Sequence, residues 1–426
     1  MAAGVAPALI GTAKARSARK TLKILQWNHF VPGYDDWFNN DYIKAWGDKN
    51  DTDVVVTNVG MSSINSRAKA EVAAQRGHDM VLFLSPPPSF EKHAIDHREI
   101  WDECQRQHGA PSDLALKSSY NPKTNRYYGF SDSFTPDPVN YRRDLWDDVG
   151  VFPDSWDAIR TGGRKILQRH RIPVGLGLAP ELDSNMALRS LLCAFGASVQ
   201  NTDGLPALKS RETIEAVKFS NALFREAMTD EVFTWDPSSN NRLLLAGRGS
   251  LALNAISITR TGENQRIPIS DRIWLAKAAE GPAGRLGLQH LVNVYVIWKF
   301  AENPDGAKQF LIDYTSEFRR AFIASEFYNF PSFPNTVPDL EKLISQDPKA
   351  NPANKYSIFA DVAKWTTNVG HPGYANAATD EIFTNWTISK MFALAAAGRM
   401  STADAVGAAD KEVREVFAKW RAEGLV

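Results

Sequence analysis

Cysteine is scarce in this chain of 426 residues, with only Cys104 and Cys193 present. Two cysteines match neither a metal-binding knuckle nor a disulfide framework. We expect two separate buried thiols, with a single bridge between them as the alternative. Because no motif ties a particular histidine to either cysteine, the sequence does not indicate a thiol-dependent enzyme.

The chain also lacks an excess of charge of either sign. Lys and Arg together number 49, as do Asp and Glu, so no broad field attracts nucleic acid or an anionic membrane. No run of 18 apolar residues occurs that would span a bilayer. In contrast, 12 Trp, 11 Tyr and 22 Phe exclude a disordered chain. Since one core rarely grows beyond about 250–300 residues, we expect a globular protein with two lobes.

Familiar catalytic and metal motifs are missing. The sequence contains no GxxxxGK[ST], GxGxxG or GxSxG pattern. His93 and His97 have the spacing of half a zinc site, but HAIDH lacks the glutamate of a zinc protease. The loop from Asp48 begins like a calcium loop, yet Asp53 stands where glycine is required. We therefore expect no metal and no cofactor, whereas a carboxylate pair for glycoside hydrolysis stays open because sequence alone cannot single one out.

Residues 1–20, MAAGVAPALIGTAKARSARK, differ from the rest. A short apolar stretch precedes small residues of the kind that signal peptidases accept, but no basic segment comes before it. We interpret this segment as the remnant of an export signal, with a disordered tail as the alternative. Export to the periplasm is the expectation. No cysteine of a lipobox lies nearby, so a lipid anchor is not supported.

The first part of the chain alternates strands and helices. Apolar strands are expected at 22–27, 53–59 and 80–84, with helices near 35–48 and 63–76 between them. Continuous apolar strands in this order are typical of a parallel α/β sheet.

The pattern then repeats further along the chain. Proline-bounded extended segments between 127 and 138 suit a passage from one lobe to the other. A helix is expected at 211–228 and further strands at 249–258 and 292–300. The last helix has a capping box formed by Ser401 and Asp404.

Several segments, taken in order, resemble the extracellular solute-binding proteins of ABC importers, in the group that carries sugars and polyols. The strongest is YYGFSDSFTPDPVNYRRDLWDDVGVFPDSWDAI, which resembles that family's passage from lobe one into lobe two. HDMVLFL, FAENPDGAKQFLIDYTS and AAGRMSTADAVGAADKEV resemble a strand, a helix and the terminal helix of the family. Each match is soft by itself, but together they cover most of residues 20–420.

The resemblance implies an α/β fold of two lobes, each a mainly parallel sheet flanked by helices, joined by crossing hinge strands. Lobe one would comprise 20–131 and 270–320, and lobe two 135–265 and 321–426, with hinges near 131–137 and 258–270. Cys104 and Cys193 would then lie in different lobes. The implied function is a non-enzymatic, monomeric receptor that captures a sugar, oligosaccharide or polyol and delivers it to a membrane permease. The alternatives are a carbohydrate-active enzyme and a binding protein for another solute.

Two segments depart from the family's pattern. Ser131 and Asp132 stand where proline is usual at the crossing, and QHLVNVYVIW replaces a glycine-rich segment. His290 is therefore expected to enter the cleft where a small residue is typical.

Sugar receptors need aromatic faces for the apolar side of the ring and planar polar groups for its hydroxyls. Such residues gather where the expected strands end, which is the ligand side of an open α/β sheet. The ligand-binding candidates are Trp27, Asn28, His29, Ser63, Ser85, Asp132, Phe134, Trp235, Asn254, His290 and Tyr374.

Several candidates have a structural interpretation as well. Trp27 ends an apolar strand and could belong to the core. His29 could be an exposed loop residue or a buried residue with its hydrogen bonds satisfied, and Asp132 could cap the crossing segment. The remaining structural roles are helix caps for Ser63 and Ser85 and lobe-packing aromatics for Trp235 and Tyr374.

Overall fold

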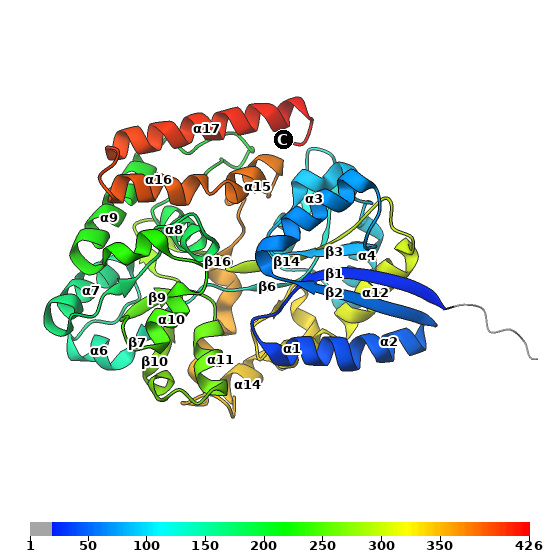
Figure 1. Ribbon diagram of the computed structural model, residues 1–426, viewed down its shortest axis with the longest axis horizontal. Helices are drawn as coiled ribbons and strands as arrows, with labels where there is room; N and C mark the ends of the chain where they lie inside the picture. Colours follow the sequence, from blue (N-terminus) through cyan, green and yellow to red (C-terminus); the bar gives the residue numbers. More distant parts are fainter. Residues whose placement is uncertain (1–18) are drawn as a thin grey trace, which may run out of the picture.

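The computed structural model describes residues 19–426 and shows two lobes side by side, each built around a β-sheet (Figure 1). The expected export signal lies almost entirely outside the described residues. Lobe one holds six strands, and its first three strands, predicted from apolar runs, are present and parallel. In sheet order the strands are β15 (Phe330–Pro331), β6 (Phe130–Thr135), β14 (Leu291–Ile297), β3 (Met80–Phe83), β1 (Lys20–Trp27) and β2 (Thr52–Val59).

Lobe two holds a smaller sheet of four strands. β8 and β9 are parallel, while β7 is antiparallel to both β9 and β10. In sheet order the strands are β10 (Ile273–Ala276), β7 (Val139–Arg142), β9 (Leu251–Leu253) and β8 (Val174–Gly175).

The α/β class is therefore confirmed, and both sheets are mixed. Two of the antiparallel strands, β14 and β7, owe their direction to the same feature of the topology. β14 and β7 each arrive from the other lobe, so they run against the strands whose carboxyl ends point towards the boundary between the lobes.

Helices cover both sheets, and several begin at caps that the sequence supplies. Ser155, Ser210 and Ser401 each accept a hydrogen bond from the backbone N–H three residues later. In lobe one the helices are α1 (Pro32–Trp37), α2 (Ile43–Lys49), α3 (Ile64–Ala74), α4 (Arg98–His108), α5 (Asp113–Lys117), α12 (Pro304–Ser316), α13 (Phe318–Ala324) and α14 (Leu340–Ser345). In lobe two they are α6 (Arg143–Asp148), α7 (Trp156–His170), α8 (Leu182–Ala194), α9 (Arg211–Ala227), α10 (Ser239–Leu245), α11 (Ser257–Asn264), α15 (Ala377–Thr384), α16 (Thr387–Ala396) and α17 (Thr402–Ala422).

The chain passes between the lobes three times. The first passage, at 136–138 between β6 and β7, lies at the expected place. The second differs from the expected hinge at 258–270. Residues 273–276 form β10 and pair with β7, so the chain stays in lobe two through β10 and returns at 277–290.

The segment 321–365 also lies elsewhere than expected. β15 pairs with β6 in the sheet of lobe one, and Phe322, Phe330 and Phe359 belong to the core of that lobe. The chain enters lobe two only after β16 (Thr366–Thr367), which pairs with β13 (Gly287–Leu288). The aromatic side chains of this segment explain the difference, because they complete the apolar face beside β6.

Each lobe has its own hydrophobic core. Cys104 lies in the lobe-one core, Cys193 is buried in lobe two, and both are free thiols, as expected. Within residues 19–426, no helix is long and apolar enough to cross a membrane. Over the same range, no three or more His, Cys, Asp or Glu side chains gather as metal ligands would.

Candidate functional site

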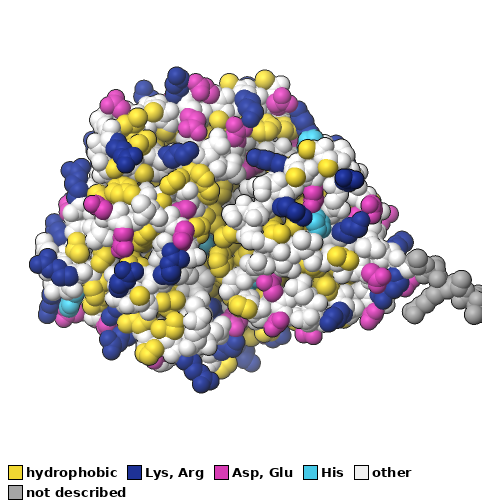
Figure 2. Space-filling view, viewed as in Figure 1, with side chains coloured by type: hydrophobic (Ala, Val, Ile, Leu, Met, Phe, Trp, Pro, Cys, Tyr) yellow, Lys and Arg dark blue, Asp and Glu magenta, His cyan; other side chains and the backbone are white. Residues whose placement is uncertain are grey.

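A pocket lies between the lobes, where the loop after β1 faces the C-terminal half of α11. It has a volume of about 340 Å³ and receives residues from α1 and the preceding loop on one side and from α11 on the other. Figure 2 shows a groove between the lobes with hydrophobic side chains gathered along it. Ligands of α/β proteins bind at the carboxyl ends of strands, and the lobe-one side of this pocket begins at Phe30, three residues after the end of β1.

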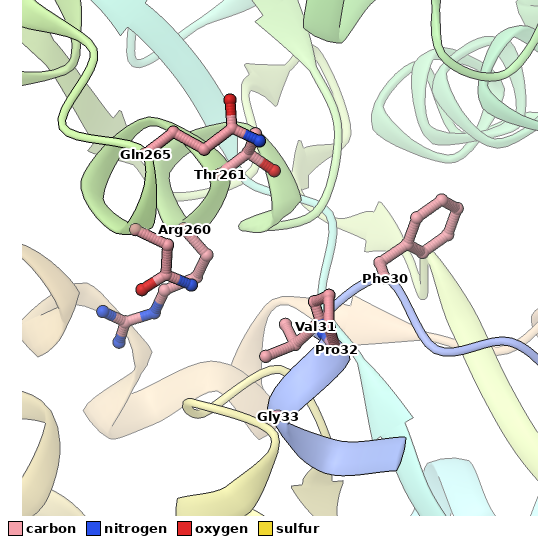
Figure 3. A pocket seen from close by; sticks show the side chains of 8 residues that line it. Phe30, Val31, Pro32, Gly33, Arg260, Thr261 and Gln265 are labelled. Carbon is pink, nitrogen blue, oxygen red and sulfur yellow. The ribbon is translucent and has the colours of Figure 1, made fainter. Parts of the chain in front are cut away.

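The two walls of the pocket differ in chemistry. Phe30, Val31 and Pro32 form an apolar wall from lobe one (Figure 3). Thr261 of α11 and Gln265, which directly follows this helix, face them with a hydroxyl and an amide. An apolar face opposite hydrogen-bonding groups suits a ligand that has both kinds of surface.

An aromatic cluster supports the lobe-one wall. The rings of Trp27 and His29 stack with their centroids 4.9 Å apart, and Phe30 lies 5.6 Å from Trp27. Tyr328 packs against both His29 and Phe30, at 5.1 and 6.1 Å. The cluster thus joins the end of β1 to the segment that follows α13.

His29 holds this cluster together as a neutral imidazole. The Val31 N–H donates to Nδ1 at 2.9 Å, so Nε2 carries the proton and donates to Asn329 Oδ1 at 3.2 Å. Burial lowers the pKa of His29 to about 4. His29 therefore positions the loop between β1 and α1 and stays uncharged at neutral pH.

A second cluster, the acid–histidine cluster, consists of Asp137, Glu181, Asp183 and His290 and joins two of the crossings to α8. His290 Nδ1 lies 3.3 Å from Asp137 Oδ1, and Nε2 lies 3.7 Å from Asp183 Oδ1. Glu181 caps α8, because its carboxylate accepts the backbone N–H of Asp183 at 2.7 Å and that of Ser184 at 2.6 Å.

Burial governs the protonation of this cluster. It raises the pKa of Asp183 to about 7, a rise that His290 opposes and Glu181 reinforces. Burial alone would lower the pKa of His290, but the carboxylates of Asp183 and Asp137 outweigh it and the pKa is raised. Burial also raises the pKa of Asp137 and of Glu181, so the cluster combines a histidine that favours its charged form with carboxyl groups that favour their neutral form.

Three asparagines extend the cluster into lobe two. Asn240 donates to Asp183 Oδ2 at 2.8 Å and accepts from Asn254 at 2.9 Å. Asn254 also donates to the side chain of Asn241. The predicted residue Asn254 is thereby linked to His290 through Asn240 and Asp183.

The other predicted residues are distributed more widely. Asn28 is exposed directly after β1, and Ser63 and Ser85 are half-buried after β2 and β3. Ser63 gives α3 no side-chain cap. Trp235 is half-buried against the core of lobe two, and Tyr374 lines another pocket between the lobes, with its ring 5.8 Å from that of Tyr120.

Asp132 and Phe134 lie inside lobe one. Phe134 packs on Phe330 in the core. Asp132 is almost fully buried, neither carboxyl oxygen has a hydrogen-bond partner among the described residues, and burial raises its pKa to about 7. Burial first, and the charge of Asp132 to a smaller extent, raise the pKa of Tyr34 and Tyr314, whose hydroxyls form a hydrogen bond of 2.7 Å with each other.

Sequence reasoning missed Tyr328, Glu181 and Asp183 as candidates. Glu181 and Asp183 follow β8. The acidic residues directly after Pro180, close to the end of a strand, could have been recognised in the sequence as candidates. Tyr328 had no such signal, because the segment that carries it was assigned to the other lobe.

No protein-family model matches the chain. Among curated proteins, matches named only as binding proteins occur in Brucella abortus and Brucella suis, with 19% identity over 184 residues. That match covers 42% of this chain and 44% of the relative, so the chain spans less than half the length of these relatives in the alignment.

Solved structures match over nearly the whole chain. An ABC transporter solute-binding protein from Thermotoga lettingae, bound with α-D-tagatose, has a TM-score of 0.75 at 16% identity and covers 93% of this chain and 100% of its own. The maltose-bound T. maritima MalE3 gives 0.75 at 16%, covering 93% and 99%. A sugar transporter from Arthrobacter chlorophenolicus with bound laminaribiose gives 0.75 at 14%, covering 93% and 99%. These likenesses show that the chain has the two-lobed fold of the solute-binding proteins.

Proposed function

We propose that this chain, which has the two-lobed fold of the solute-binding proteins of ABC transporters, is a receptor that captures a sugar, oligosaccharide or polyol between its lobes. The observation that carries the proposal is the pocket between α1 and α11, with an apolar wall from one lobe and a polar wall from the other. The sugars bound by proteins of the same fold support the same ligand class.

The chemistry of the walls fits this ligand class. A sugar ring has an apolar face of C–H groups, which Phe30 and Pro32 can cover, and a rim of hydroxyls, which Thr261 and Gln265 can pair with. A ligand favours closure only through contacts that it makes better in the closed form. A site with walls from both lobes meets that condition.

In this proposal the predicted residues differ in how directly they contact the ligand. Asn28, Asn254 and His290 are proposed to lie within reach of the ligand, and Trp27 and His29 to support Phe30 from behind. Trp235 and Tyr374 are proposed to border the groove at its edges, with Ser63 and Ser85 at the ends of β2 and β3.

The wider assignments belong to the same proposal. The protein would act as a monomer without catalysis, reside in the periplasm and deliver its ligand to the permease of an ABC importer. The two-lobed fold of transport receptors supports this assignment.

The test is a thermal-shift and calorimetric screen of sugars, oligosaccharides and polyols, with the bound compound analysed by mass afterwards. We expect a rise in melting temperature with an unchanged ligand mass. Phe30→Ala should weaken binding about tenfold or more, since it removes a stacking face, whereas Phe152→Ala, on the surface of lobe two, should not. A flat screen would contradict the proposal, and conversion of the ligand would favour an enzyme.

A further inference from the structure

We infer that the protein has a second saccharide-binding site, separate from the pocket between α1 and α11. It lies in the pocket that Tyr374 lines, which we call the α17 pocket because Arg421 of α17 also lines it. Its volume of about 380 Å³ is typical of a small-molecule site. The two pockets share no lining residue, and Figure 1 places α1 and α11 at the bottom of the molecule and α17 at the top. A second site there goes beyond the proposed function, which needs only the first pocket.

Both lobes build the α17 pocket. Lobe one contributes the turn 121–123, which follows the short strand β4 (Tyr120–Asn121). The lobe-two wall consists of residues 202–205, 374, 376, 421 and 426. The walls are joined where the ring of Tyr374 lies 5.8 Å from that of Tyr120. They are joined again where the Ala375 N–H donates to the Lys117 carbonyl at 2.9 Å. A ligand in this pocket would therefore contact both lobes and favour their closed arrangement.

Buried amide side chains hold the two walls in place. In lobe one, Asn121 accepts the backbone N–H of Lys123 at 2.9 Å. In lobe two, the amide of Gln200 donates to the Tyr374 carbonyl at 2.8 Å and accepts from the side chain of Asn376 at 2.6 Å. Asn121, Gln200 and Asn376 are all buried. The pocket is therefore preformed, which lowers the conformational cost of binding a ligand.

Several lining side chains are left free by this scaffold. Within residues 19–426, no side-chain hydrogen bond or ion pair engages Lys123, Thr202, Asp203, Tyr374 or Arg421. Lys123 and Asp203 take part in hydrogen bonds only through their backbone N–H groups. The free groups come from both lobes, Lys123 from lobe one and the others from lobe two. They are available to a ligand that enters the pocket.

The chemistry of these side chains favours a neutral saccharide. The ring of Tyr374 can cover the C–H face of a sugar. The carboxylate of Asp203 accepts hydrogen bonds and the guanidinium of Arg421 donates them, and a sugar hydroxyl can pair with either. Because the lining carries both signs of charge, with Asp203 offsetting Lys123 and Arg421 in part, a ligand with several hydroxyls is favoured over a simple anion.

Calorimetry on the full chain tests for the second site, with maltose, laminaribiose, D-tagatose and ribitol as probes. We expect at least one probe to occupy two sites per chain. Tyr374→Ala should weaken one of them about tenfold or more because a stacking face is lost, and Phe30→Ala should weaken the other. Arg421→Gln should act like Tyr374→Ala, since it removes charge-assisted hydrogen bonds. Lys411→Gln, which changes an exposed cation of α17 outside the pocket, should leave both affinities unchanged.

A tyrosine NMR signal locates the binding directly. In protein with isotope-labelled tyrosine, Tyr374→Phe assigns the signal of Tyr374. We expect that signal to shift as the second site fills, both in the wild type and in Phe30→Ala. Circular dichroism and the melting temperature show whether each variant is folded.

The possible outcomes separate the second site from the proposed function. One site per chain that Phe30→Ala weakens and Tyr374→Ala leaves intact, with no shift of the Tyr374 signal, would overturn the inference and leave the proposed function standing. One site that only Tyr374→Ala and Arg421→Gln weaken would support binding in the α17 pocket and contradict the proposed use of the first pocket. Failure of all the probes to bind would overturn the inference, and the wider screen of sugars and polyols would then decide the proposed function by itself.

Discussion

His290 and Asp137 link two separate passages of the chain between the lobes, with Nδ1 of the imidazole 3.3 Å from Oδ1 of the carboxylate. Both side chains are almost fully buried. His290 also faces Asp183 at the start of α8. The contact therefore fixes the two crossings to each other and to lobe two.

Replacing His290 with glutamine should destabilise the protein strongly. The change leaves Asp137 and Asp183 buried without a cation, which costs about 3–5 kcal/mol when a buried pair is broken. Chemical denaturation at neutral pH measures this loss. His170→Gln is the matched control, because His170 pairs with Asp148 near the surface and should cost less than about 1 kcal/mol. The double variant with Asp137→Asn should lose less than the sum of the single losses, and strict additivity would contradict the coupling.

Arg260 forms a second link between the lobes, at their base. From α11 it pairs with Glu263 at 3.0 Å and with Asp347 at 2.6 Å, and its guanidinium lies 3.8 Å above the ring of Tyr356. All of these side chains are buried, and Asp347 and Tyr356 belong to the segment 321–365.

Arg260→Lys should destabilise the protein by about 2–4 kcal/mol although it keeps the charge, since lysine cannot pair with two carboxylates and stack at once. The melting temperature and urea denaturation provide the measurement. Arg242→Lys changes an exposed arginine paired with Asp236 and should have almost no effect. Equal stability of the two variants would show that the buried network contributes nothing.

Much of the fold could be predicted from local patterns. The apolar runs at 22–27 and 80–84 correspond to β1 and β3, and Ser401 caps α17 as its spacing with Asp404 indicates. The strand expected at 249–258 is shorter in the structure and covers 251–253. It ends there because the side chain of Asn254 hydrogen-bonds to Asn240 and α11 begins at Ser257.

The candidate site was harder to predict, for a physical reason. Its residues come from strand ends that only the tertiary fold brings together, and two of them resemble ordinary helix-capping acids. Glu181 does cap α8, and Asp183 occupies the first turn. Tyr328 joins the site only because β15 adds to the edge of the first sheet beside β6, a pairing that no periodicity reveals.

Asp132 should make stability depend on pH. Its pKa is raised from 3.8 to about 7 in the folded protein, so the folded state holds a proton that the unfolded chain has released. Below about pH 4 the group is protonated in both states, so its titration does not lower the free energy of unfolding. The free energy of unfolding falls progressively as the pH rises from 4 to 7, and the loss is complete above pH 7.

Asp132→Asn removes this titration. Relative to the wild type, the variant should gain stability between pH 4 and pH 8, by about 4 kcal/mol in the difference of the unfolding free energies. Denaturation of both proteins at several pH values gives this difference. The neighbouring Tyr34, Tyr295 and Tyr314 do not titrate in this range because their pKa values are raised further. A difference that does not change with pH would contradict the raised pKa of Asp132.

Ser89 and Asp380 hold the lobes together at the rim opposite Arg260. Ser89, in the short helix Pro88–His93 of lobe one, donates its hydroxyl to Asp380 Oδ2 of α15 at 2.5 Å, and its backbone N–H lies 3.3 Å from the same oxygen. Burial raises the pKa of Asp380 to about 6, a rise that Ser89 opposes. This contact exists only when the lobes are close together.

Ser89→Ala should therefore shift the protein towards a more open form. A hydrogen bond to a charged group contributes about 1.5–3 kcal/mol, so the apparent affinity for any ligand that requires closure should fall by up to about a hundredfold. Small-angle X-ray scattering of the unliganded protein should show a larger radius of gyration. Ser210→Ala, which removes the cap of α9 within lobe two, should lower the melting temperature without changing either quantity. Ser89→Ala could instead lower the melting temperature without changing the affinity or the radius of gyration, as is expected of Ser210→Ala. In that case the contact stabilises the fold and takes no part in closure.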